Sequence, residues 1–375
     1  MANDIRVRAI SSSKELMQFI KFPWKIYKDD PHWVPHLIMD RKKFLNREKN
    51  PFFKENPTEF YLAYRNGEIV GRIAAILNHR HNEFHKDKAG FFGFLEAVND
   101  KAVFEALLNT AKDWLREKGR DKILGPMNPS TNDEVGFLLE NFDAPPYFLM
   151  THTPPYYIEI MEALGYQKAK DLYTYYLDQD TSVITPKMER VEKVLMKKFQ
   201  VKIRSVNLKD FNNELEIVRE IYNDAWAPNW GFVPMTREEF DFVADDFKKI
   251  ADPNITLIGE YKGEPIGFAL VMPNYNEVFS KIRNGKLLPF GLFKFLWYKR
   301  KINSVRIIIL GTKREYQKLG LGALFYAETM RRCKAQNYFH GEMSWILEDN
   351  ELMNKAAVMM GGEIYKKYRI YEMAL

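Results

Sequence analysis

A basic, glycine-containing loop between an expected strand and an expected helix is the part of the sequence best suited to chemistry. Residues 305–310 are apolar and mostly β-branched, which predicts a strand, and residues 311–322 then hold Gly311, Gly320 and Gly322. A helix is expected to begin directly afterwards, because apolar residues recur at helical spacing as far as residue 333. Glycines let a ligand approach the backbone closely, and the first free amides of a helix point towards it. The loop therefore predicts a site for a phosphate or pyrophosphate group.

The loop has two other interpretations, a dinucleotide-binding turn and a plain turn without a ligand. A dinucleotide fingerprint is disfavoured, because the pattern G-x-G-x-x-G is absent and no parallel βαβ series surrounds the loop. Glycine-rich turns also occur in proteins without any ligand, so the loop alone does not decide between an anion site and a plain turn.

The elements that must position the loop belong to an internal repeat. Asn66-Gly67 and Lys262-Gly263 each separate two apolar runs, which is typical of a β-hairpin. Gly361 follows Gly165 by the same number of residues that separates the two hairpin turns. Each of these glycines ends an expected helix, and a strand follows it. The shared order of these landmarks favours a duplicated domain.

The N-terminal copy differs at the place where the loop would lie. A strand over residues 91–97 leads into an amphipathic helix that begins after Asp100 and ends at Gly119, and residues 98–102 contain no glycine pair. We predict a degenerate domain over residues 1–180, a linker over 181–200 and a ligand-binding domain over 201–375.

Composition indicates a globular protein. The 375 residues are 46% hydrophobic and 14% aromatic, which excludes a disordered chain, and Cys333 is the single cysteine, expected in the core. We expect a cytoplasmic protein, since no signal peptide or membrane-spanning stretch is evident. We expect a solvated loop, and no metal site, at His79, His81 and His85. The net charge of +6 is mild, and the short basic clusters give no reason to expect nucleic-acid binding.

The pattern Gln317-x-x-Gly320-x-Gly322 resembles the Q/R-x-x-G-x-G/A signature of the GNAT acyltransferase superfamily. The surrounding order of hairpin, strand, loop, helix, strand and helix also resembles that family over residues 200–375. The whole layout is similar to tandem-domain members such as the N-myristoyltransferases and mycothiol synthases. The resemblance implies an α+β fold with two GNAT-like domains, each a mixed, mostly antiparallel sheet flanked by helices.

The resemblance also implies a co-substrate, acetyl-CoA or a longer acyl-CoA, and residues that bind it. The backbone around Leu310 and Thr312 would pair with the pantetheine arm. The amides of the loop would bind the pyrophosphate, and three basic side chains would add positive charge for the phosphates. The loop residues in this expectation are Lys313, Arg314, Gln317, Lys318, Leu319, Gly320, Leu321 and Gly322.

In the family an amine attacks the thioester directly, which needs a base for the ammonium and an acid for the leaving thiolate. The family often places a tyrosine acid seven residues after the Asn that opens the last helix; counting from Asn350 reaches Ala357 instead. Tyr368 is the candidate acid, with Tyr365 as an alternative. Glu342 is the candidate base, because it lies in an otherwise apolar strand.

Structural explanations stand beside these catalytic ones. A solvent-facing position on the strand would explain Glu342 equally well. Glu348 and Asp349 are also candidate bases, but we favour a helix-capping role for them.

Two segments are candidates for substrate contact. Trp230, Phe232 and Asn132 are assigned to the acceptor site, although a packed aromatic turn capped by Thr236 would equally explain residues 226–236. Residues 286–301 are aromatic and basic, which is typical of a flap that contacts a membrane surface or covers a long acyl chain. A buried connection or an oligomer contact would also explain this segment.

These observations favour an acyl-CoA-dependent N-acyltransferase that acts on an amine, with a long acyl chain or a lipid amine as the finer hypothesis. The missing tyrosine at Ala357 keeps open a non-catalytic acyl-CoA sensor or scaffold. A nucleic-acid-binding regulator is a third alternative. The sequence leaves the oligomeric state open.

Overall fold

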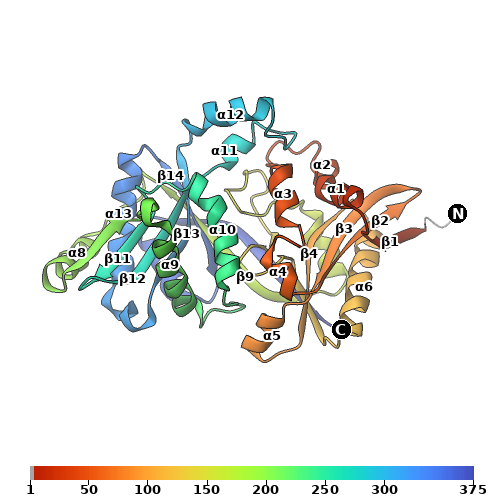
Figure 1. The fold of residues 1–375 in the computed structure, drawn as a ribbon, viewed down its shortest axis with the longest axis horizontal. Coiled ribbons are helices and arrows are strands. Elements are labelled where there is room, and N and C mark those ends of the chain that lie inside the picture. The colour runs from red at the N-terminus through yellow and green to blue at the C-terminus, as the bar shows by residue number, and fades with distance from the viewer. Residues whose placement is uncertain (1–3) are drawn as a thin grey trace. The chain divides into compact units, whose positions relative to one another are not determined.

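The computed structural model describes residues 4–375, which fold into two units that each combine a mixed sheet with flanking helices (Figure 1). Unit 1 comprises residues 4–171, Val278–Trp297 and Lys367–Leu375, and unit 2 comprises Leu172–Glu277 and Tyr298–Lys366. The α+β expectation is therefore confirmed. The predicted boundaries near residues 180 and 200 stay a prediction, although residues 186–198 of the expected linker form a helix.

The elements of unit 1 form a sheet in the order β1-β2-β3-β4-β5-β15, with a small β6–β7 ladder and short β8 beside it. Their bounds are β1 (Ile5–Ala9), α1 (Ser13–Lys21), α2 (Pro23–Ile26), α3 (Ile38–Phe44), α4 (Pro51–Glu55), β2 (Thr58–Arg65), β3 (Glu68–Ile76), α5 (His79–His85), β4 (Ala89–Ala97), α6 (Lys101–Glu117), β5 (Lys122–Gly125), β6 (Met127–Asn128), β7 (Glu134–Val135), β8 (Phe137–Leu138), α7 (Tyr156–Ala163), α12 (Phe290–Lys299) and β15 (Glu363–Ala374).

Unit 2 has the strand order β9-β14-β13-β12-β11-β10. Its elements are β9 (Gln167–Asp178), α8 (Pro186–Lys198), β10 (Val201–Ser205), the 3-10 helix η1 (Leu208–Asp210), α9 (Phe211–Trp226), α10 (Arg237–Ile250), β11 (Leu257–Tyr261), β12 (Glu264–Pro273), α11 (Asn276–Phe279), β13 (Ser304–Thr312), the 3-10 helix η2 (Arg314–Leu319), α13 (Leu321–Ala335), β14 (His340–Leu347) and α14 (Glu351–Met359). The bounds of β9, β15, α11 and α12 each include residues of both units.

The two predicted hairpins are confirmed. Asn66 and Gly67 have φ values of 50° and 82° between β2 and β3, and Lys262 and Gly263 have 51° and 87° between β11 and β12. Two consecutive positive φ values are the conformation that a two-residue hairpin turn requires.

In each unit, the pairing between two parallel strands stops before the longer of the two strands ends. In unit 1 the β4–β5 pairing runs from Ala89↔Lys122 to Phe91↔Leu124, and in unit 2 the β13–β14 pairing runs from Ser304↔His340 to Ile307↔Met343. Beyond these pairs β4 and β13 also shift register against their antiparallel neighbours, as at a β-bulge. The repeat predicted from the sequence therefore extends to the sheet irregularities.

Apolar stripes hold the helices on these sheets. Helix α6 packs on β3 and its neighbours, with Val103, Leu107 and Leu115 buried, as its spacing predicts (Figure 1). In unit 2, α13 and α9 belong to different core clusters, one around Ala269 and one around Phe268. Since neighbouring strand residues face opposite sides of a sheet, the two helices cover opposite faces.

Cys333 lies in the core of unit 2, as expected, and burial raises the pKa of its thiol to about 12.

Two local expectations are wrong. Residues 79–85 form helix α5 rather than a solvated loop, because Asn78 caps the helix and the His81 ring is buried against Phe91. Residues 286–301 are not a buried connection: Phe290, Phe293 and Trp297 are 76%, 72% and 64% exposed. Along residues 4–375, no helix is both long and apolar enough to cross a bilayer.

Candidate functional site

The glycine loop of unit 2 has the geometry that its sequence predicts. Strand β13 ends at Thr312, η2 follows, and Gly320 takes a φ of 82° immediately before α13. Gly320 has no side chain to cap the helix, so the first amides of α13 are left for another acceptor. A Cβ at Gly322 would meet only the Tyr326 ring, at 3.7 Å, so this part of the loop is open on its outer side.

The equivalent helix start in unit 1 is closed by its own carboxylate. Asp100 accepts a hydrogen bond from the backbone N–H of Ala102 at 2.9 Å and pairs with Arg65 at 2.6 Å. A carboxylate at this position satisfies the amides and the helix dipole from within the chain. The contrast gives a physical reason why the predicted anion site belongs to the start of α13 and not to the start of α6.

The predicted basic side chains are held by carboxylates of helix α9. Lys313 Nζ lies 2.6 Å from Glu220, and Arg314 donates to Asp224 through its backbone N–H and its Nε atom at 2.7 and 3.0 Å. Exposed ion pairs of this kind contribute about 0–1 kcal/mol, so a phosphate can replace the carboxylates at little cost. Lys318 is exposed on η2.

The ring of Trp226, a residue not assigned to the loop from the sequence, packs against the end of the strand before the loop. A side chain at Gly311 would collide with the ring of Trp226, and that ring stacks on Tyr222. Leu310 and Thr312 pair with Ala269 and Gly267 of β12. The pairing of β13 with β14 ends at Ile307, so the following residues of β13 are not paired with β14 in that register.

Glu342 lies at the centre of a buried polar network in unit 2, so the solvent-facing interpretation is wrong. Its carboxylate accepts hydrogen bonds from Ser344 Oγ at 2.5 Å and from the hydroxyl of Tyr365, and Arg306 Nε lies 3.9 Å away. Burial lowers the pKa of the neighbouring Lys366 to about 8, against the opposing effect of Glu342. The structure therefore brings Glu342 together with Tyr365, the alternative acid.

The other candidates near the end of the chain are packed into the fold. Tyr368 is fully buried on β15 in unit 1, opposite Leu138 of β8. Ala357 is fully buried in the core of unit 2. Asn350 caps α14 by accepting a hydrogen bond from the N–H of Met353, so the capping role predicted for Glu348 and Asp349 is filled by their neighbour.

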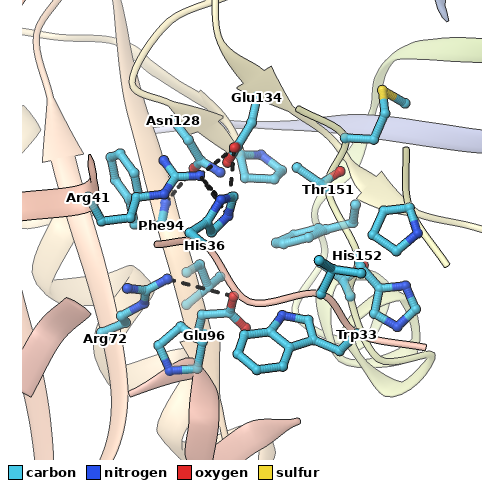
Figure 2. Close-up of a pocket in the computed structure, with 18 of the residues that line it drawn as sticks. Trp33, His36, Arg41, Arg72, Phe94, Glu96, Asn128, Glu134, Thr151 and His152 are labelled. Atoms are coloured by element: carbon cyan, nitrogen blue, oxygen red, sulfur yellow. Dashed lines mark hydrogen bonds and ion pairs between the residues drawn. The ribbon is translucent and has the colours of Figure 1, made fainter. Parts of the chain in front are cut away.

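Unit 1 contains a pocket that sequence reasoning missed (Figure 2). Its cavity is about 70 Å³, and ionisable side chains from five separate segments line it: His36, Arg41, Arg72, Glu96, Glu134 and His152. The available signal was a charged residue inside each of two apolar strands, Arg72 in β3 and Glu96 in β4. A buried charge of this kind is kept only when it is paired.

Relatives and solved structures identify the family. The chain is 38% identical to Protein YghO of Escherichia coli, over 98% of this chain and 94% of the relative. It is 37% identical to the Bacterial ceramide synthase of Caulobacter vibrioides, over 99% of this chain and 98% of the relative. No family model matches the chain.

Among solved structures, a tandem GNAT protein from the clavulanic acid biosynthesis pathway superposes with a TM-score of 0.58 at 11% identity, covering 99% of this chain and 98% of that one. A GCN5-related N-acetyltransferase from Sphaerobacter thermophilus gives 0.51 at 12% identity, covering 99% and 95%. The chain belongs to the family of YghO and the bacterial ceramide synthase. Its fold is that of the tandem-domain GNAT proteins.

The predicted acceptor residues lie in both units. Phe232 is buried against Tyr222 in unit 2, with ring centroids 5.7 Å apart, and Trp230 is half-buried before it. Thr236 caps α10 in a capping box, so the interpretation as a packed, capped turn is confirmed. Asn132 lies in unit 1, where its backbone N–H donates to Ser130 Oγ at 3.2 Å. Within residues 4–375, no group of three or more His, Cys, Asp or Glu side chains is placed to hold a metal ion.

Proposed function

We propose that this protein is an acyltransferase that moves a long acyl group from acyl-CoA to the amine of a long-chain amino alcohol. The observation that carries the proposal is the uncapped glycine start of α13, in a chain that is 37% identical along 99% of its length to a protein named bacterial ceramide synthase. A ceramide is the amide of a fatty acid with a long-chain amino alcohol. The loop therefore supplies the site for the acyl donor, and the relative's name suggests the acceptor class.

The chain's own residues would bind acyl-CoA at both ends of the loop. The amides from Gln317 to Gly322 would bind the pyrophosphate, as the helix dipole favours. Lys313, Arg314 and Lys318 would contact the remaining phosphates after the first two leave their α9 partners. The backbone of Leu310–Thr312 would hold the pantetheine arm.

The reaction is a direct acyl transfer. The amine nitrogen attacks the thioester carbonyl carbon, the carbon–sulfur bond breaks, and the thiolate takes up a proton equivalent to the one that the amine loses. Glu342 is the proposed base, and Tyr368 or Tyr365 the proposed acid. The Tyr365–Glu342 hydrogen bond supports Tyr365, because it joins the two titrating groups that this step requires.

Helix α12 supports the lipid part of the proposal. Large apolar side chains are exposed along this segment, and basic residues flank them (Leu288, Phe290, Phe293, Leu296, Trp297; Lys286, Lys294, Lys299, Arg300, Lys301). Apolar side chains that enter the interface, together with cations near anionic head groups, are typical of helices that lie on a bilayer. We propose that α12 contacts the membrane surface, where a long-chain amine is found.

The test combines donor binding with product formation. Purified full-length protein is expected to show a larger thermal shift with palmitoyl-CoA than with acetyl-CoA, and to release free thiol and form an amide with a long-chain amino alcohol. A larger shift with acetyl-CoA would contradict the long-chain assignment.

Gly320→Glu is expected to abolish acyl-CoA binding and transfer together, because it places a carboxylate at the anion site. Gly263→Glu is the matched control: Gly263 has a similar positive φ of 87° in the same unit but lies in the β11–β12 turn. If both variants bind acyl-CoA like the wild type, the loop is not the donor site.

The alternative of an acyl-CoA sensor is favoured by one observation, the buried alanine at position 357. It predicts bound acyl-CoA without thiol release for any amine tested, and the same assay distinguishes the two functions.

A further inference from the structure

The pocket of unit 1 is a built polar site, separate in the sequence from the donor loop. The bulged strand β4 supplies Phe94 and Glu96, and the backbone N–H of Phe94 donates to Asn128 Oδ1 at 2.6 Å. Helix α3 supplies Arg41, and Glu134 comes from β7. Figure 2 shows these side chains converging on one cavity, with Trp33 and Thr151 on its wall.

Two ion pairs lie in the pocket. Arg41 donates to the Glu134 carboxylate, and Arg72 approaches Glu96 at 3.7 Å. Burial disfavours the charged form of Glu134, but the Arg41 guanidinium outweighs it and holds the pKa of this carboxyl below its ordinary value. Burying such charges is energetically costly, so a cluster of them around a cavity marks a candidate binding site.

The cavity and its exposed edge indicate the size of a ligand. About 70 Å³ of space holds about five water-sized groups, the size of a small polar head group. The His36 side chain lines the cavity and is 46% exposed, which marks the open side. The carboxylate of Glu134 is only 9% exposed and lies further inside.

The partners of the charged groups favour a cation over an anion. The Arg72 guanidinium donates to the carbonyl of Phe19 at 2.7 Å and lies over the Phe19 ring, and its buried Nε, which has no hydrogen-bond partner within residues 4–375, can donate to a ligand hydroxyl. Arg41 and His36 both approach the Oε1 atom of Glu134, which leaves Oε2 for a ligand. Trp24, Trp33 and Phe94 supply aromatic walls, which attract an ammonium group.

The rim of the pocket adjoins the segment that carries α12. Arg283 donates to the carbonyls of Asp30 and Trp33, and Trp24 Nε1 donates to the carbonyl of Arg283 at 2.8 Å. The exposed apolar residues of α12 follow directly after this anchored stretch. A polar pocket whose rim is tied to an apolar surface segment suits an amphiphile with a small polar head.

We infer that this pocket binds the head group of a primary amino alcohol, with Glu134 as the counter-ion of the ammonium and the surrounding amide and hydroxyl groups as partners of its hydroxyls. The inference rests on the proposed function for the identity of the amine, but the binding itself requires no acyl-CoA.

The experiment uses the full-length protein without acyl-CoA. 2-Amino-1,3-propanediol is titrated and followed by saturation-transfer NMR, and glycerol, which has a hydroxyl in place of the amine, is the matched ligand. We expect a Kd on the order of 1 mM for the amino alcohol and a much weaker response to glycerol. Equal responses to the two ligands would overturn the inference.

Variants connect the binding to the pocket. Glu134→Gln is expected to raise the Kd at least about tenfold, since it removes the counter-ion. Glu59→Gln is the matched control, because Glu59 also pairs with an arginine, Arg47, but outside the pocket. Thr151→Leu fills the wall without touching an ion pair and is expected to weaken binding even if Glu134→Gln fails to fold. Unchanged binding in folded Glu134→Gln or in Thr151→Leu would refute the pocket.

The inference and the proposed function fail in different ways. Gly320→Glu is expected to lose acyl-CoA binding and to keep the amino-alcohol response. A response without any acyl transfer would reject the proposed function and support the pocket. Transfer without a response that depends on Glu134 would reject the pocket alone.

Discussion

Asp100 and Gly320 begin corresponding helices in the two units and differ in whether the chain supplies its own anion. The Asp100 carboxylate binds the amides of α6 and the Arg65 guanidinium, whereas Gly320 leaves the start of α13 uncapped. The difference of one side chain therefore separates a helix start that the chain caps itself from one whose first amides are left for the proposed ligand.

Asp100→Ala is expected to lower the free energy of unfolding by about 1 kcal/mol, because α6 loses its cap and Arg65 its partner. Urea unfolding followed by circular dichroism measures the change. Asp113→Ala is the control, since Asp113 forms only an exposed pair with Arg116 and should cost under about 0.5 kcal/mol. Equal effects of the two substitutions would contradict the capping role.

His81 makes unit 1 sensitive to acid. Burial and the neighbouring His85 lower the pKa of His81 to about 4, with Asp87 opposing them and Lys122 adding to the decrease. In the unfolded chain the imidazole titrates near its ordinary value of about 6.5. Between these values the unfolded state binds more protons, so stability present at neutral pH is lost as the pH falls.

His81→Leu should remove this part of the acid sensitivity. At pH 5 the unfolded wild-type chain binds a proton at His81 that the folded protein mostly does not, which lowers the free energy of unfolding by about 2 kcal/mol relative to pH 8. The variant should lack this loss. Urea unfolding at the two pH values gives the difference. His79→Leu, on the exposed side of the same helix, should keep the wild-type dependence. The same pH dependence in both variants would rule His81 out as its source.

At the scale of elements, α12 is unusual because its apolar side chains face outward. The exposed Phe293 and Trp297 would each bury most of their area on reaching a lipid interface. Lys294 does not oppose this, because its ammonium is tied to the carbonyl of Lys281 at 3.0 Å.

The double variant Phe293→Asp/Trp297→Asp is expected to lose most of its binding to vesicles that contain phosphatidylglycerol. Co-sedimentation measures the bound fraction, and the thermal midpoint should hardly change because both residues are exposed. Leu352→Asp on α14, where Leu352 is 73% exposed, is the control that should bind like the wild type. Full vesicle binding by the double variant would exclude α12 as the contact.

At the scale of the molecule, each unit is assembled from segments far apart in the chain. Unit 1 needs the last residues of the protein: Tyr371 to Ala374 of β15 pair with Gly125 to Lys122 of β5. Tyr371 also belongs to the core of unit 1 and contacts Phe137, with ring centroids 6.3 Å apart. The stability of unit 1 therefore depends on residues more than 200 positions away.

A chain that ends at Lys366 should lose unit 1 as a stable structure, since removing one buried aromatic side chain alone costs about 3–5 kcal/mol. Thermal unfolding of the truncated and full-length proteins tests this expectation. Lys367→Ala is the control, because Lys367 forms a partly exposed pair with Glu140. An unchanged unfolding curve for the truncated chain would show that β15 is dispensable.

The sequence alone determined the local parts of this protein. The turns at Asn66-Gly67 and Lys262-Gly263, the helix ends at Gly165 and Gly361, and the loop at Gly320 all follow from the conformations that single residues favour. Such signals depend on neighbours within a few positions, so they can be read without the fold. They were also sufficient for the duplicated GNAT-like layout.

Tertiary structure decided everything that depends on distant partners. Arg41 and Glu134 are 93 positions apart, and their pairing turns two ordinary charged residues into the wall of a pocket. Glu342 looked equally like a surface residue until packing placed it in a buried network, and α12 looked equally like a buried segment until its side chains proved exposed. Burial and pairing depend on which elements meet, and that is set by the whole fold rather than by local sequence.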